Sequence, residues 1–227
     1  MSGPQGVPAW QVSRLASSHP AGAALADLPW SDLAALSALR LSDGSGDAVQ
    51  RTAVRLAWDD AALYVRFDCE DRDAWGTFTR RDEPLYQEEV VEIFLAPGSA
   101  VPASYAELEV SPRGTLFDAW VENPDGRRET MRVDPAWECS GLRWETGSTG
   151  VREDWWTALA IPWAALAANG LRPASLRANF YRIERPRDGG PAEWSAWSPT
   201  LVDPPDFHRP ARFGLLTLDP ASGPSRR

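Results

Sequence analysis

The sequence predicts an all-β protein, a jelly-roll-type antiparallel β-sandwich with two short helices. About nine segments alternate apolar and polar residues, which is typical of strands that place one face against a core. Gly, Pro, Asn and Asp recur between these segments, and helical patterns are scarce. The 227 residues are enough for one large domain with a substantial core.

The first part of the chain predicts a short helix and a hairpin. Residues 30–39, WSDLAALSAL, are expected to form a helix with Ser31 as its cap. Residues 52–58, TAVRLAW, and 63–69, LYVRFDC, both alternate as strands do. The DDAA between these two segments indicates a hairpin turn.

Two central strands carry glutamates on one face. In residues 89–96, EVVEIFLA, alternation places Glu92 on the face opposite to Ile93. In residues 105–111, YAELEVS, the glutamates at 107 and 109 lie opposite to Leu108. Further strands are expected at residues 114–122, 142–148, 154–161, 176–184 and 212–218, and a second helix at 162–170, between Pro162 and Gly170.

One domain is expected over residues 9–218, between loose tails at 1–8 and 219–227, because no repeat or linker divides the chain. All 23 basic residues are Arg, and the net charge of −9 argues against a nucleic-acid partner. No apolar run is long enough to span a membrane. No signal peptide is visible, so a cytoplasmic location is expected, or an extracellular one if a signal was trimmed. The oligomeric state is left open.

Two further features concern cysteines and metals. Cys69 and Cys139 are far apart and match no zinc spacing, so two reduced, partly buried thiols are expected. The stretch DCEDRD groups oxygen ligands where a strand runs into a loop. It therefore has two interpretations, a structural calcium site or a solvated strand end. The calcium candidates are Asp68, Glu70, Asp71 and Asp73, and no other cofactor is expected.

Several segments occur in a distinctive order: TAVRLAWDDAALYVRFDCED, YQEEVVEIFLAP, YAELEVSP, DWWTALAIPW, RANFYRIE, WSAWSPT and DFHRPARFGLLTL. Their order and spacing resemble the family 9 carbohydrate-binding modules, and most closely the bacterial family 9-like group. The resemblance covers residues 9–218. It implies a β-sandwich without catalytic activity that binds a mono- or oligosaccharide.

The resemblance also implies a site in which the sugar stacks between two aromatic side chains. The matching positions are Tyr86, just before the VEIF strand, and Phe207, just before the terminal segment. Glu92 matches a glutamate that hydrogen-bonds sugar hydroxyls. The sequence departs from the family at four positions. Tyr and Phe replace two tryptophans, Glu109 stands near the place of an arginine, and Pro204 or Pro205 stands near that of an amide.

The strand patterns and the last loop add weaker ligand-binding candidates. Arg182, Glu109 and Trp120 are expected on the same face as Glu92. His208 lies in a loop stiffened by prolines, where it either packs or contacts the ligand.

Alternatives to a sugar-binding module remain open. The acids are then solvated residues in ordinary ion pairs, and the loop aromatics plug the core. Adjacent carboxylates are also what a jelly-roll glycoside hydrolase requires, in which case Glu92→Gln abolishes turnover. A third alternative is a sandwich that mediates protein contacts, which an exposed aromatic patch favours over a narrow cleft.

Overall fold

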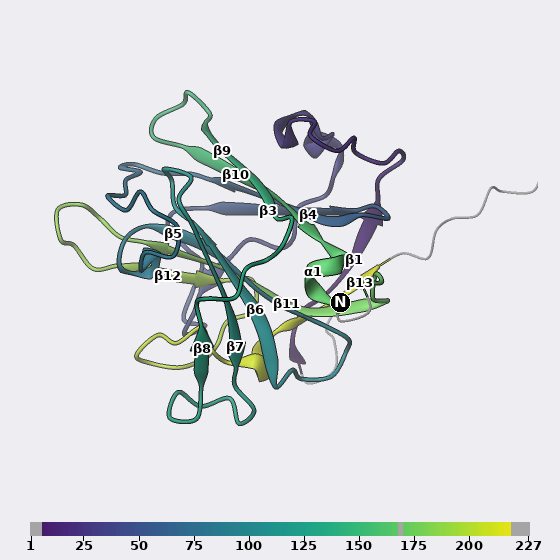
Figure 1. Ribbon diagram of the computed structural model, residues 1–227. Coiled ribbons are helices and arrows are strands. Elements are labelled where there is room, and N and C mark those ends of the chain that lie inside the picture. Colours follow the sequence, from purple (N-terminus) through teal and green to yellow (C-terminus); the bar gives the residue numbers. More distant parts are fainter. Residues whose placement is uncertain (1–5, 168–169, 219–227) are drawn as a thin grey trace, which may run out of the picture.

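The computed structural model describes residues 6–167 and 170–218, and its strands form a continuous path that curls over on itself (Figure 1). The path runs β8, β7, β6, β5, β11, β13, β1, β3, β4, β10, β9, while β12 pairs with β11 and β2. The bounds are β1 Ala9–Arg14, β2 Arg40–Leu41, β3 Thr52–Trp58, β4 Ala62–Cys69, β5 Val90–Pro97, β6 Ser104–Val110, β7 Leu116–Glu122, β8 Arg132–Asp134, β9 Arg143–Ser148, β10 Trp155–Pro162, β11 Ser175–Glu184, β12 Glu193–Ala196 and β13 Gly214–Leu218.

The curl packs the half of the path containing β5, β6 and β11 against the half containing β3, β4 and β10, which makes the β-sandwich that the sequence predicts. Apolar side chains from both halves, such as Leu56, Phe67, Ile93 and Phe180, form one core between them. The hairpin of β3 and β4 turns at Asp59, whose side chain accepts the backbone N–H groups of the turn.

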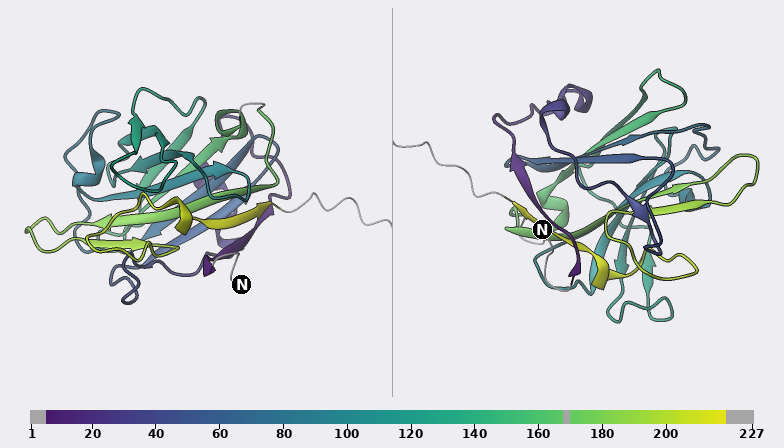
Figure 2. Two further views of the ribbon diagram at one scale, coloured as in Figure 1. Left: turned by 90° about the horizontal axis from the view of Figure 1, so that it is seen from below. Right: turned by 180° about the vertical axis from the view of Figure 1, so that it is seen from behind.

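The first strand joins the two halves. Within the described ranges every strand pair is antiparallel except the two that β1 makes, with β13 and with β3. Figure 2 shows β1, in purple, beside β13, in yellow. Long connections separate these strands along the chain, and parallel pairing requires such connections. Val7 is buried and the Pro8 carbonyl accepts the backbone N–H of Leu215, so the last two residues of the predicted N-terminal tail are held.

Residues 1–5 of that tail and the predicted C-terminal tail, residues 219–227, lie outside the described residues. The two cysteines are free and buried, as expected for reduced thiols. No helix within the described ranges is long and apolar enough to cross a membrane.

The helical segments are shorter than the sequence predicts. The second predicted helix is one turn, α1 Trp163–Leu166, and residues 168–169 of its range lie outside the described residues. The predicted helix over 30–39 is wrong beyond a 3-10 turn at Trp30–Asp32. Leu36 instead donates its backbone N–H to Val54 on β3. Pairing with a strand outweighs an isolated helix of this length, whose nucleation is costly.

A second apolar cluster covers the outer face of β5, β6, β7 and β11. Phe94, Tyr105 and Tyr181 project from this face, and Leu85, Phe207 and Phe213 pack onto it from the loops. This cover explains why the outer face is buried although it carries several charged residues. It also positions the cleft described next.

Candidate functional site

A cleft of about 410 Å³ lies over this outer face. Its walls include the 3-10 turn Leu85–Gln87, the segment that carries Arg128 and Met131, and the loop that carries Phe207 and His208. Its lining residues are Asp82, Pro84, Tyr86, Glu92, Glu107, Glu109, Phe117, Arg128, Met131, Val133, Pro135, Trp194, Phe207 and His208. The cleft falls within the size range of small-molecule sites.

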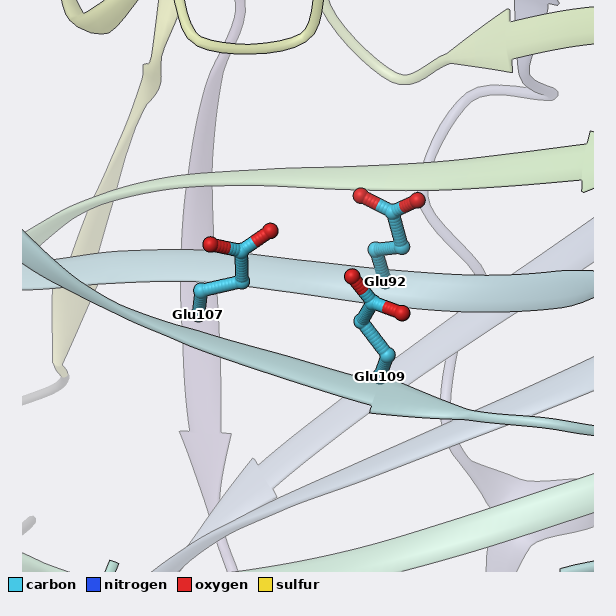
Figure 3. A group of neighbouring side chains, drawn as sticks. All are labelled: Glu92, Glu107 and Glu109. Atoms are coloured by element: carbon cyan, nitrogen blue, oxygen red, sulfur yellow. The ribbon is translucent and has the colours of Figure 1, made fainter. Parts of the chain in front are cut away.

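Three glutamates from neighbouring strands, Glu92, Glu107 and Glu109, form the acidic floor of the cleft. Glu92 on β5 lies directly opposite Glu109 on β6, and Glu107 precedes Glu109 by two residues on the same face. One carboxylate oxygen from each residue lies within 4.8 Å of the others. Figure 3 shows the three side chains projecting to the same side of the sheet.

Burial dominates the electrostatics of the acidic floor. All three glutamates are buried, and neither carboxylate oxygen of Glu109 makes a hydrogen bond of normal geometry among the described residues, although the Tyr86 backbone and the Glu107 carboxyl group lie close enough to shift its pKa. Desolvation, reinforced by the neighbouring acids, raises the pKa of Glu92 and Glu109 well above the usual value. Desolvation also raises the pKa of Glu107 to about 7. The floor therefore gains from any ligand that supplies hydrogen-bond donors or positive charge.

His208 closes one end of the acidic floor. Its Nδ1 lies 2.8 Å from the hydroxyl of Tyr105, and its Nε2 lies 3.8 Å from Oε1 of Glu107. Burial lowers the pKa of His208 to about 4, so the imidazole is neutral near pH 7. The positive charge among the cleft-lining residues is instead Arg128, whose Nη2 lies 2.8 Å from Oδ1 of Asp206.

The two aromatic positions implied by the resemblance both line the cleft, but they differ in exposure. Tyr86 is 47% exposed, whereas Phe207 is 3% exposed. The Phe207 ring stacks on Tyr181 at 4.1 Å between ring centroids and meets the edge of Trp194 at 5.1 Å. Phe207 is therefore part of the packed outer cluster as well as part of the cleft wall.

The structure brings five of the seven predicted ligand-binding residues into this cleft: Tyr86, Glu92, Glu109, Phe207 and His208. The placement of Arg182 and Trp120 on the same face is wrong. Arg182 pairs with Val91 across the β5–β11 ladder, and Trp120 pairs with Ala106 across the β6–β7 ladder. These registers direct both side chains to the opposite face of the sheet.

Both misplaced residues have structural partners on that opposite face. The Arg182 guanidinium lies 2.7 Å from Asp71 and 2.9 Å from Glu89, and all three side chains are buried. The Trp120 indole lies against Trp137, with 5.7 Å between ring centroids. Arg182 therefore neutralises buried carboxylates, and Trp120 contributes to the core.

The four calcium candidates do not form a common site. Because of the alternation along β4 and the bend after it, the four side chains point in different directions and pair with different arginines. Asp68 binds Arg55 and Arg66, Glu70 lies 3.7 Å from Arg152, Asp71 binds Arg182, and Asp73 lies 3.2 Å from Arg187. Among the described residues, the acids that bring three ligand atoms together are those of the acidic floor.

Sequence reasoning missed several cleft residues, among them Trp194 and Arg128. Trp194 is on β12, which pairs with β11 next to β5, and this placement depends on long-range strand order. Arg128 lies in a turn that carried no signal beyond its composition. A larger hollow of about 780 Å³ lies over β3 and β4, but its Arg55 and Arg66 are ion-paired with Asp68.

Fold and cleft together define a class of protein, a β-sandwich module with an aromatic and acidic cleft on one sheet. Residues 46–218 match the family described as Carbohydrate-binding family 9. The chain belongs to this family, which confirms the resemblance seen in the sequence.

Individual proteins are similar to this chain in sequence or in fold. An extracellular protein of Arthroderma benhamiae is 25% identical over 176 residues, which are 74% of this chain and 78% of that protein. A candidate carbohydrate-binding protein from Bacteroides uniformis superposes with a TM-score of 0.74 at 17% identity, covering 93% of this chain and 99% of that one. A family 9 module from Caldicellulosiruptor kristjanssonii, in complex with cellotriose, superposes with a TM-score of 0.62 at 16% identity, covering 96% and 97%.

Proposed function

We propose that the protein binds a saccharide in this cleft and does not hydrolyse it. The proposal is carried by the combination, in one cleft of a carbohydrate-binding family 9 fold, of aromatic walls and buried acids, of which Glu109 has no hydrogen-bond partner of normal geometry among the described residues. A sugar ring has an apolar C–H face and a rim of hydroxyl groups. The cleft offers a surface of each kind.

Tyr86 and Phe207 supply the apolar contact. An aromatic ring that covers the C–H face buries apolar area on both partners. The acidic floor and Arg128 meet the hydroxyl rim, because carboxyl groups and a guanidinium both form hydrogen bonds with hydroxyl groups. Saccharide donors would satisfy the Glu109 oxygens that lack partners among the residues the structure describes.

The arrangement of the acids supports binding rather than hydrolysis. A glycosidase places its two carboxyl groups on either side of the scissile bond. The three glutamates of the acidic floor instead project from two neighbouring strands to the same side of the sheet (Figure 3). The cleft also favours a small ligand over a protein partner, because Tyr86 is the only exposed aromatic residue in the described ranges.

Calorimetric titration with glucose, cellotriose and a panel of other oligosaccharides tests the proposal. We expect saturable binding of at least one sugar with unit stoichiometry. Tyr86→Ala is expected to weaken binding roughly tenfold, or about 1.4 kcal/mol, through loss of the stacking surface. Val101→Ala is the matched control, because Val101 is 42% exposed and does not line the cleft.

Chromatography of the same mixtures after long incubation tests the absence of hydrolysis. We expect no shortened sugar. Product that disappears in Glu92→Gln would instead make the protein a glycoside hydrolase. Failure of the whole panel to bind at millimolar concentration would overturn saccharide recognition.

A further inference from the structure

The acidic floor gathers three buried carboxyl groups, and no buried arginine is found among the described residues that line the cleft. Three carboxylates meet there, and Arg128 is the guanidinium among the cleft-lining residues. That guanidinium is 57% exposed and is ion-paired with Asp206. Two other buried acids, Asp71 and Glu89, differ in this respect, because they share the buried Arg182.

Glu109 points most directly to a missing partner. Its side chain is 1% exposed, and both of its carboxylate oxygens lack a hydrogen-bond partner of normal geometry among the described residues. It lies opposite Glu92 in the ladder and faces the cleft. The charged form of such a carboxylate is costly without a partner, and a cation placed among the three groups would compensate that cost.

The spacing of the acidic floor suits a single cation. One oxygen from each glutamate lies within 4.8 Å of the others. Two ligands on the same calcium ion lie about 2.3–2.6 Å from it, and so at most roughly 5 Å from each other. One ion among the three residues can therefore reach an oxygen of each. Carboxylate oxygens select hard cations such as Ca²⁺, Mg²⁺ and Mn²⁺.

We propose that Glu92, Glu107 and Glu109 bind one hard divalent cation at the floor of the cleft, and that saccharide hydroxyls complete its coordination. Three protein ligands leave coordination positions open for the Ca²⁺ class, which takes six to eight oxygens. Tyr86 and Phe207 line the same cleft as the three glutamates. The second part of the proposal rests on the proposed function, whereas the cation site itself does not.

Cation binding is measured first, without sugar. The full chain is treated with a chelator and titrated with Mn²⁺ by electron paramagnetic resonance and with Ca²⁺ by calorimetry. We expect one site per chain, weakened at least tenfold in Glu109→Gln and in Glu92→Gln. Glu70→Gln is the matched control, because Glu70 is a half-exposed acid in the other acidic stretch and is expected to leave the affinity unchanged.

Two results would overturn the cation site. One is the absence of Mn²⁺ and Ca²⁺ binding at millimolar concentration in protein whose unfolding midpoint is normal. The other is binding that persists in Glu109→Gln and disappears in Glu70→Gln, which would place the ion at the end of β4. The variants stay informative because both replacements keep the side-chain shape, and the unfolding midpoint of each reports whether it has folded.

Sugar titrations with Ca²⁺ and with chelator then separate the two proposals. Binding that requires the cation supports both. Cation binding without any sugar binding overturns the saccharide function and leaves the cation site standing. Sugar binding that is equal with and without the cation overturns the coordination of the cation by sugar hydroxyls. If, in addition, no cation binds, the cation site is overturned and the saccharide function stands.

Discussion

Replacement of Phe207 by alanine tests whether this ring supports the fold, the cleft or both. The ring is 3% exposed, stacks on Tyr181 at 4.1 Å and meets Trp194 at 5.1 Å. Truncation removes these contacts and leaves a cavity, so Phe207→Ala is expected to lower the free energy of unfolding by about 3–5 kcal/mol. In a domain of this size that corresponds to a fall in Tm of very roughly 6–20 °C.

Tyr86→Ala provides the comparison, since this ring is 47% exposed. Its removal is expected to change the free energy of unfolding by no more than about 0.5 kcal/mol. Sugar binding, in contrast, is expected to weaken in both variants, because both rings line the cleft. Stability measurements and sugar titrations on the same preparations therefore distinguish the two roles.

Guanidinium unfolding followed by tryptophan fluorescence measures the stability of each variant. A change in the unfolding midpoint at constant slope reports a change in stability. Phe207→Leu keeps most of the apolar volume but removes the flat ring, so it should lose less stability than Phe207→Ala and still bind sugar weakly. A Phe207→Ala variant as stable as wild type would refute the contribution of this ring to packing. A variant with unchanged sugar affinity would refute its contribution to the cleft wall.

Three further predictions concern other parts of the molecule. Arg182→Met is expected to cost about 3–5 kcal/mol by unfolding, because it leaves the buried Asp71 and Glu89 uncompensated; a loss below about 1 kcal/mol would contradict this. His208 has a folded-state pKa of about 4 against an ordinary value of 6.5, so its stabilising contribution is complete above pH 6.5 and is lost as pH falls toward 4. Chemical unfolding at several pH values should show this loss in wild type, and less of it in His208→Gln. Gly214→Ala is expected to cost about 1–3 kcal/mol by thermal unfolding, because the added methyl group collides with an indole ring packed against the backbone; an unchanged Tm would contradict the close packing.

The burial of the acidic floor has a consequence for solution conditions. Glu107, with a pKa raised to about 7 from 4.5, contributes stability below pH 4.5 that is lost as pH rises through 7. This is the opposite sense to His208, whose Nε2 lies 3.8 Å from the same carboxylate. The folded state therefore loses stability through His208 as the pH falls toward 4 and through Glu107 as the pH rises through 7. A bound cation would remove the loss that Glu107 causes at high pH.

Local patterns in the sequence were sufficient for the strands and for which side chains share a face within one strand. Glu92 does lie opposite to Ile93, and the turn at Asp59 forms as the DDAA segment predicts. These features depend on the two-residue period of a strand and on short-range hydrogen bonds, which are properties of neighbouring residues. Family membership likewise follows from the order of the strand segments along the chain.

Only the tertiary structure decided which faces of different strands meet. Arg182 and Trp120 alternate as predicted within their strands, yet the ladder registers send both to the core side. The glutamates of the acidic floor look solvated in sequence but are buried, because loops distant along the chain pack over their face. Register and loop packing arise from contacts between residues far apart in sequence, and a period within one strand carries no information about them.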